Sequence, residues 1–166
     1  MMVENANSHA ASGTSQANGS LMRVSPLGIF DAGQPTVAAE HAAADSRLTH
    51  PHPVCEDACA VFVAAIASAV AEDVDADACY EFAVRTADRL NVRPEVREAL
   101  AEAEDHPPSD YLTYQGWVLI ALQNAFYQLL HASNFEEGVT ATVMAGGDTD
   151  TNAAIAGALL GAVHGR

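Results

Sequence analysis

Apolar residues recur at three- and four-residue intervals through most of this chain, and no run alternates at period two for long enough to make a convincing strand. Such spacing places apolar side chains on one face of an α-helix, whereas a half-buried strand needs strict alternation. The pattern is fullest after Pro53, in one long set of apolar residues: Val54, Ala58, Val61, Phe62, Ala65, Ile66 and Ala69. The sequence therefore predicts an all-α bundle.

Other segments show the same periodicity. Further helices are predicted over residues 36–45, 75–90, 94–103, 117–131 and 151–163. Another helix is expected to start at a capping box, Ser133 to Glu136, and to run to about Ala145. Residues 105–115 are predicted to form a loop. Residues 23–30 are predicted to be an apolar stretch broken by Pro26 and Gly28.

Length and charge restrict the class of protein. A chain of 166 residues, 49% hydrophobic and 17% charged, suits a single domain. The formal net charge is −15, from 22 acidic and 7 basic residues, and no basic cluster or basic amphipathic stretch is present. We therefore expect neither nucleic-acid binding nor membrane-surface binding. The N-terminus has no apolar signal segment, and residues 117–130 are shorter than the ~20 residues needed to span a bilayer, so a cytoplasmic protein is predicted.

The strongest chemical signal is the turn Gly146-Gly147-Asp148-Thr149-Asp150-Thr151, ahead of the last predicted helix. Its carboxylates and hydroxyl form an all-oxygen cluster, which suits Mg²⁺, Mn²⁺ or Ca²⁺ better than zinc. The paired glycines allow a tight turn and a close approach of the backbone to a ligand. We predict a Mg²⁺-type site here, with the remaining ligands supplied by water, substrate or another part of the protein.

The helix after this turn carries small residues at four-residue spacing: Ala153, Gly157 and Gly161. A bare stripe lets another helix pack very close, and a tightly held helix fixes the carboxylates before it. The alternative interpretation is an ordinary helix N-terminus, where Asp and Thr are common caps.

Other residues admit a functional and a structural interpretation. His50, His52, Cys55 and Cys59 are zinc-ligand types, but their spacing fits no usual zinc pattern, and the cysteines suit core packing. The chain has three cysteines, Cys55, Cys59 and Cys79, which are too few for a disulfide scaffold. The acidic residues Asp73, Asp75 and Asp77 read as helix-start charges, and His131 as a helix C-terminal cation. Packing is also expected for Gln123 and Asn124. The aromatic residues Tyr111, Tyr114 and Trp117 have two possible roles, stacking on an adenine or packing in the interior.

The segment GGDTDTNAAIAGALLGAVHGR, at positions 146–166, closely resembles the C-terminal motif of the ADP-ribosylglycohydrolase family, which includes the dinitrogenase-reductase-activating glycohydrolases. Asn18-Gly19-Ser20-Leu21-Met22-Arg23, with Ser25 to Gly28 after it, resembles the mid-chain substrate loop of that family. Thr49-His50 and the following helix resemble its next segment. The resemblance is ordered along residues 17–166. Residues 1–17 are expected to be a flexible lead-in, and residues 18–166 the C-terminal part of one such domain.

The resemblance implies an orthogonal all-α bundle with a two-metal centre, usually Mg²⁺ and sometimes Mn²⁺. In this family the metals bind ribose hydroxyls and orient water at the anomeric carbon, and hydrolysis releases ADP-ribose from a protein or small molecule. By motif position, Asp148, Asp150 and Thr151 would be metal ligands. Asn18, Gly19 and Ser20 would line the phosphate–ribose side of the pocket, with His50 near the substrate.

The family's Thr-Asp-Asp triplet and an early acidic residue, which lie in its N-terminal half, have no counterpart in this sequence. The resemblance therefore implies that part of the metal site is missing. One hypothesis is that the chain contributes part of a metal-dependent hydrolase. The alternative is a truncated or degenerate relative, inactive alone, that binds ADP-ribose or a partner chain. Apolar faces at residues 117–130 and 153–161 are expected to be exposed and to cause self-association or marginal folding.

Overall fold

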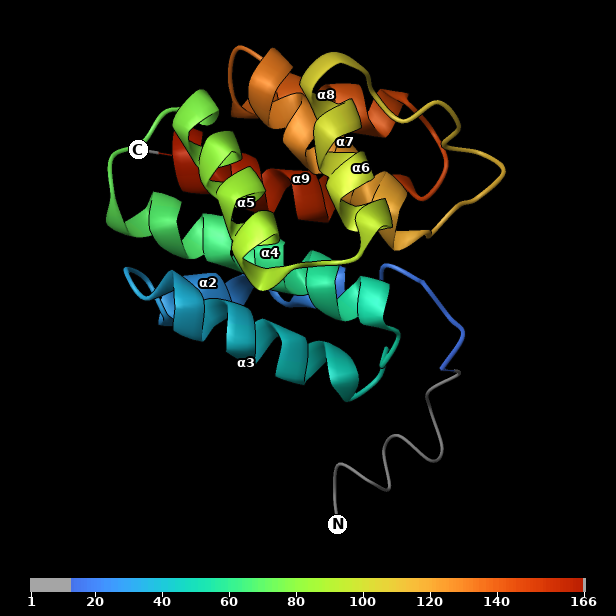
Figure 1. Ribbon diagram of the computed structural model, residues 1–166. Coiled ribbons are helices and arrows are strands. Elements are labelled where there is room, and N and C mark those ends of the chain that lie inside the picture. The colour runs from blue at the N-terminus through green and yellow to red at the C-terminus, as the bar shows by residue number, and fades with distance from the viewer. Residues whose placement is uncertain (1–12, 166) are drawn as a thin grey trace.

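The computed structural model describes residues 13–165, and these form a helical bundle with no strand. The elements, in chain order, are η1 (Leu21–Arg23), α2 (Ser25–Phe30), α3 (Pro35–Arg47), α4 (Pro53–Ala71), α5 (Ala76–Leu90), α6 (Pro94–Asp105), α7 (Val118–His131), α8 (Phe135–Met144) and α9 (Thr149–His164). Helices α2 and α3 lie on one side of α4, and α5 to α9 lie on the other (Figure 1). The predicted all-α fold is confirmed.

Helix α4 is the centre of the fold. It contacts helices on both of its sides, including α2, α3, α5 and α9, and its residues from Ala58 to Ala69 are all buried. By length and composition α4 could cross a membrane, but 78% of its most apolar window is buried inside the bundle. Its apolar character is therefore explained by burial. This helix, of 19 residues, is a longer apolar segment than residues 117–130, from which the sequence-based prediction of no membrane span was made.

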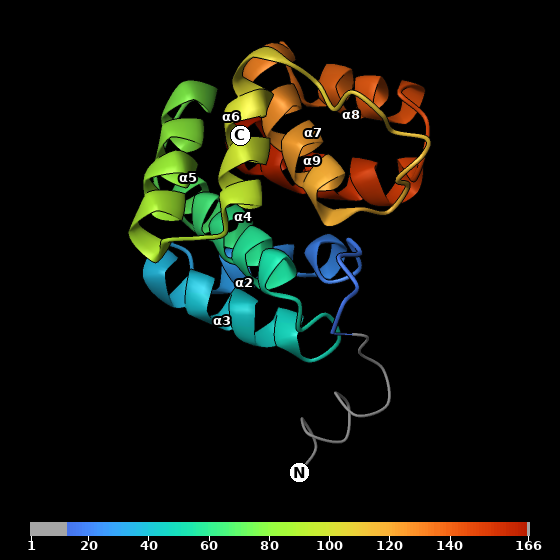
Figure 2. The same ribbon diagram turned by 45° about the vertical axis from the view of Figure 1, so that its right-hand side comes forward.

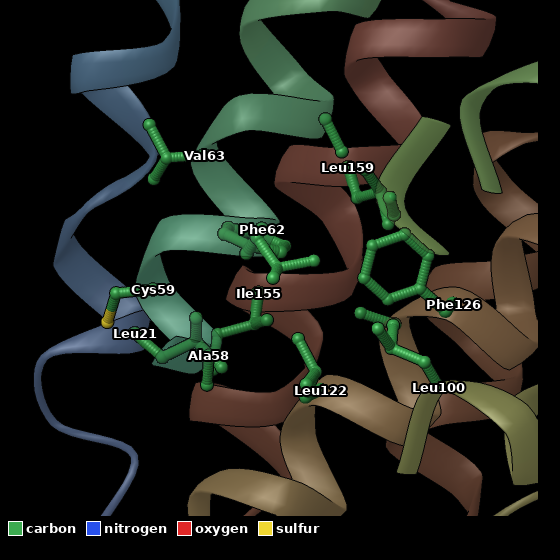
Figure 3. Close-up of a cluster of buried hydrophobic side chains, with 14 of the residues drawn as sticks. Leu21, Ala58, Cys59, Phe62, Val63, Leu100, Leu122, Phe126, Ile155 and Leu159 are labelled. Carbon is green, nitrogen blue, oxygen red and sulfur yellow. The ribbon is translucent and has the colours of Figure 1, made fainter. Parts of the chain in front are cut away.

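The main core lies where α4, α7 and α9 meet. Phe62 of α4, Phe126 of α7 and Ile155 of α9 are almost fully buried there, and α6 adds Leu100 (Figure 3). Leu21 of η1 is also part of this cluster. Truncating such a buried aromatic residue typically costs about 3–5 kcal/mol, so these contacts hold the distant segments together.

The segment predicted to be broken by Pro26 and Gly28 is in fact helix α2. Pro26 stands in the first turn, where its missing N–H costs nothing. Gly28 is buried against α4: a Cβ at this position would lie 2.5 Å from Cγ2 of Ile66 and 3.2 Å from the carbonyl oxygen of Val63. The glycine therefore marks a close helix contact rather than a break.

The start of α8 differs from the prediction by one residue. The N-cap is Asn134, whose Oδ1 accepts a hydrogen bond of 3.0 Å from the Glu137 N–H. In return, Oε2 of Glu137 accepts a bond of 2.9 Å from the Ser133 N–H. Glu137 is thus bonded through its N–H to Asn134 and through its carboxylate to Ser133, in place of the predicted pairing of Ser133 with Glu136.

Replacing Asn134 with alanine is expected to lower the free energy of unfolding by about 1 kcal/mol, because an unsatisfied N–H would be left at the start of α8. The matched variant Ser133→Ala keeps the N-cap oxygen and removes only an exposed contact between the Ser133 hydroxyl and the Glu137 carboxylate, so it is expected to change the free energy of unfolding by less than about 0.5 kcal/mol. Urea unfolding followed by circular dichroism measures both. Equal losses in the two variants would contradict this assignment of the cap.

The faces predicted to be exposed are largely covered within the chain. Gly157 packs against Val139 at 3.5 Å and Phe135 at 3.7 Å, measured from an ideal Cβ, so α8 occupies the small-residue stripe of α9. Most of α7 is buried by α6, α8 and α9. The predicted exposure was wrong for most of α7, whereas Ala153, Gly157 and Gly161 of α9 are half-buried. Self-association stays a prediction. In the part of the chain that is described, the most exposed large apolar side chains are Phe30 and Met144, each 79% exposed.

Candidate functional site

The acidic turn joins α8 to α9 and begins with two glycines in the left-handed region. Gly146 has φ 85° and Gly147 has φ 73°, angles that other residues adopt only with strain. Asp148 is the N-cap residue of α9, but its side chain makes no capping hydrogen bond. The helix-cap interpretation of this carboxylate therefore does not describe its geometry, and the carboxylate is left for another partner.

That partner is Asn18, 130 positions earlier in the chain. Its Nδ2 donates a hydrogen bond of 2.9 Å to Oδ2 of Asp148. The Asn18 N–H donates to the carbonyl oxygen of Gly116 at 2.8 Å, and the residue is only 6% exposed. A Cβ on Gly116 would lie 3.6 Å from Oδ2 of Asp148, so this glycine borders the carboxylate. A predicted substrate-loop residue and a predicted metal ligand thus lie in direct contact.

The loop between α6 and α7 holds the turn in place (Figure 2). A Cβ on Gly147 would overlap the carbonyl oxygen of Tyr111. Tyr111 in turn donates from its hydroxyl to Oδ1 of Asn124 at 2.8 Å, and Nδ2 of Asn124 donates to Oγ1 of Thr142 at 3.0 Å. Burial raises the pKa of Tyr111 to about 12, so this hydroxyl remains a donor. Asn124 has the packing role predicted for it.

His50, which the resemblance places near the substrate, lies against the Asn18–Ser20 loop. A Cβ on Gly19 would lie 2.8 Å from Cε1 of His50, so the imidazole packs directly on the glycine. Its Nδ1 is 2.8 Å from Oγ1 of Thr49. Burial, and then the positive charge of Arg23, lower the pKa of His50, which favours a neutral ring at physiological pH.

Ser20 differs from its predicted position at the pocket surface. Its side chain is fully buried, accepts a hydrogen bond of 3.0 Å from Oγ of Ser46, and lies 3.5 Å from Sγ of Cys59. Ser46 and Cys59 come from α3 and α4, so these contacts anchor the loop to the core. Ser20 therefore helps to fix the positions of Asn18 and Gly19 through its contacts with the core.

The cysteines pack in the core, as the structural interpretation predicted. Cys55, Cys59 and Cys79 are free and buried, and His52 caps α4 by accepting the Val54 N–H at 3.2 Å. The residues considered for zinc therefore have structural partners. Burial raises the thiol pKa from 9.0 to about 12 for Cys55, about 11 for Cys59 and about 12 for Cys79.

These pKa values predict lower stability in alkali. Since folding holds the thiols protonated, their contribution is complete below pH 9 and falls as the pH rises toward 11–12, because the unfolded chain ionises first. The urea midpoint is expected to be lower at about pH 10.5 than at about pH 8. The triple variant Cys55→Ala/Cys59→Ala/Cys79→Ala should show a shallower decline. An equally steep decline would assign the effect to other groups, such as Tyr111.

The other predicted metal ligands follow in the first turn of α9. Asp150 is exposed and Thr151 is half-buried. The donor set of two carboxylates and a hydroxyl fits a hard, oxygen-binding cation. However, residues 13–165 contain no group of three or more His, Cys, Asp or Glu side chains placed to hold a metal ion. The turn therefore supplies an incomplete ligand set.

Two further residues at the site were missed by sequence reasoning. Gly116, with φ 77°, borders Asp148; a glycine just before a predicted helix was the available signal. Asn152 is 2% exposed, and its Oδ1 has no hydrogen-bond partner among the described residues. It lies one turn after Asp148 on α9, and its polar side chain within an apolar helix was the signal there.

A cavity of about 610 Å³ opens beside Gly116. It is lined by Gln16, Ala17 and residues 113–117, so the aromatic rings of Tyr114 and Trp117 form part of its wall. Gln16 and Ala17, predicted to be in the flexible lead-in, are in fact held here. Val118 N–H donates to Gln16 at 2.9 Å, and Ala17 forms a β-bridge with Trp117. Residues 1–12 of that predicted segment lie outside the described residues.

Comparison with known proteins shows the family and the fold of the chain. The family model described as ADP-ribosylglycohydrolase matches residues 1–166. The ADP-ribosyl-[dinitrogen reductase] glycohydrolase of Rhodospirillum rubrum is 26% identical over 89% of this chain and 46% of its own length. An uncharacterized protein of Archaeoglobus fulgidus is 29% identical over 87% of this chain and 48% of its own length.

A solved structure titled "ADP-ribosylglycohydrolase-related protein complex" matches the fold with a TM-score of 0.81. It is 21% identical in sequence, and the match covers 98% of this chain and 57% of that one. The chain thus spans about half the length of the curated relatives it matches.

Proposed function

Because the chain belongs to the ADP-ribosylglycohydrolase family, we propose that it supplies part of the active site of a metal-dependent hydrolase. The reaction releases ADP-ribose from an ADP-ribosylated protein or small molecule. The observation that carries this proposal is the position of the Asp148 carboxylate. It makes no capping hydrogen bond at the start of α9 and accepts a hydrogen bond from Asn18, which belongs to a distant segment of the chain.

Asp148, Asp150 and Thr151 would hold Mg²⁺, with Mn²⁺ as the second choice. When bound, the metal would supply charge stabilisation and an anchor for ribose hydroxyls and water. Because Oδ2 of Asp148 accepts a hydrogen bond from Asn18, Oδ1 is the oxygen that would coordinate a cation. A carboxylate fixed in this way loses less conformational freedom when it binds a ligand.

The remaining residues of the site would bind and orient the substrate. The neutral imidazole of His50 on Gly19 offers a hydrogen-bonding edge, and the cavity beside Gly116 offers the rings of Tyr114 and Trp117 for an adenine. In the hydrolysis, the bond from the anomeric carbon to the leaving nitrogen or oxygen breaks. A bond from that carbon to the water oxygen forms, and a proton of the water passes to the leaving group.

The incomplete ligand set supports a shared active site. We place the remaining ligands in the portion of the relatives that this chain does not match. The same observation favours the alternative function, in which the chain alone binds ADP-ribose or a partner chain without hydrolysing a substrate.

The test is to co-express the chain with a polypeptide that corresponds to the unmatched part of the Rhodospirillum rubrum relative. Mixture and single chain are then assayed for release of ADP-ribose from an ADP-ribosylated protein, with Mg²⁺ and with a chelator. Release by the mixture alone, abolished by the chelator, is the expected result. Absence of release from every mixture, together with calorimetric binding of ADP-ribose to the chain, would reject hydrolysis and support the alternative.

A further inference from the structure

A second cavity, of about 630 Å³, lies between α6, α7 and the loop that joins them. Its floor is apolar and buried: Ala99 is 6% exposed, Leu119 is 5% exposed and Ile120 is 7% exposed. The rings of Tyr114 and Trp117 form part of its wall, at a centroid distance of 6.1 Å and in an edge-to-face arrangement. We call this cavity the α6–α7 groove.

Apart from His106, the charged side chains that line the groove are acidic. Glu95, Glu98 and Glu102 recur at three- and four-residue spacing, so they share one face of α6. In residues 13–165 none of these three glutamates takes part in an ion pair. Asp110 lies on the opposite, loop side, and its Oδ1 accepts the Leu112 and Thr113 N–H groups at 2.9 Å.

The arginines of this region are engaged elsewhere. Arg93 at the N-cap of α6 lies 3.9 Å from Asp57 of α4, and Arg97 lies 3.8 Å from Asp88 of α5. Neither arginine lines the groove. The ion pairs of α6 thus face α4 and α5, and the carboxylates of the groove are left without a cation from the described residues.

We propose that the α6–α7 groove docks an arginine-bearing segment of a partner protein. An acidic rim attracts a cation, an apolar floor accepts the methylene groups of a long side chain, and aromatic rings stack on a planar guanidinium. Lysine would gain the charge contact but less of the stacking.

The position of the groove connects it with the candidate active site. Tyr114 and Trp117 line both the groove and the cavity beside Gly116, which borders Asp148. A basic segment in the groove would therefore lie next to a modified side chain placed at the acidic turn. As a role in substrate recognition, this inference rests on the proposed function; as a binding site, it does not.

The probe is a blocked peptide in which four arginines alternate with glycines, and its control is the same peptide with citrulline in place of arginine. Citrulline keeps the shape of arginine and removes its charge. Trp117 is the one tryptophan of the chain and lines both the groove and the cavity beside Gly116, so its fluorescence reports binding at either one, and substitutions in the groove identify which. In fluorescence titrations without metal or ADP-ribose, the dissociation constant of the arginine peptide is expected to be at least ten-fold lower than that of the citrulline peptide.

Variants separate the groove from the overall negative charge. Glu98→Gln/Glu102→Gln is expected to weaken binding of the arginine peptide about ten-fold. Glu40→Gln/Glu136→Gln removes the same charge from exposed sites outside the groove and is expected to weaken it less than about two-fold. Equal weakening in both variants, or equal binding of the two peptides, would overturn the proposal. Absence of hydrolysis in the co-expression test, with these binding results intact, would reject the proposed function alone.

Discussion

Replacing Gly147 with alanine is expected to lower the midpoint of thermal unfolding by roughly 10 °C, through a loss of about 3 kcal/mol. Two effects add. The left-handed backbone at φ 73° strains any residue with a Cβ, and that Cβ would overlap the carbonyl oxygen of Tyr111. Because the overlapping atom belongs to the backbone, a rotamer change cannot relieve it.

Gly33→Ala is the matched control. Gly33 has a similar φ of 79°, but its nearest neighbour, Cβ of Ala71, would lie at an ordinary contact distance of 3.5 Å. Only the backbone strain remains, so a loss of about 1 kcal/mol is expected. Differential scanning calorimetry measures both variants. Similar melting temperatures for the two would show that the loop containing Tyr111 does not press on the acidic turn.

Asp148→Asn is expected to reduce Mg²⁺-dependent release of ADP-ribose by the co-expressed protein at least 100-fold. The substitution keeps the size of the side chain but removes the charge that would neutralise the cation, and loss of one such electrostatic contact typically costs 10²–10³ in rate. It also places the amide of Asn18 beside another amide, in place of a charge-assisted hydrogen bond. The measurement is the initial rate of release as a function of Mg²⁺ concentration.

Asp77→Asn is the control for general effects of charge removal. Asp77 is exposed in the first turn of α5 and belongs to none of the segments of the candidate site, so the rate is expected to stay within about two-fold of the parent. If Asp148→Asn retains the parent rate and the parent Mg²⁺ dependence, the acidic turn does not bind the catalytic metal.

Local patterns predicted the helices well, because each is specified by residues close together in sequence. The periodicity of apolar residues located α4 and α7, and Asp75 caps α5 as its position suggested. Helix α2 was missed because Gly28 serves a contact with Ile66, nearly 40 positions away. A local rule interprets such a glycine as a break, since nothing nearby indicates the neighbouring helix.

The candidate site was predicted in part. Motif resemblance brought the Asn18–Ser20 loop, His50 and the acidic turn into one region, and the contacts of Asn18 with Asp148 and of Gly19 with His50 agree with that grouping. The buried position of Ser20 and the contribution of Gly116 could not be predicted. Both follow from how α3, α4 and the loop before α7 meet, and no spacing rule within a single segment contains that information.

Tyr114 and Trp117 form a wall common to two cavities. A molecule that moves these rings from one side alters the surface offered on the other side. Occupancies of the two spaces are then thermodynamically linked, and the linkage is reciprocal: whatever factor one guest imposes on the affinity of the second, the second imposes on the first.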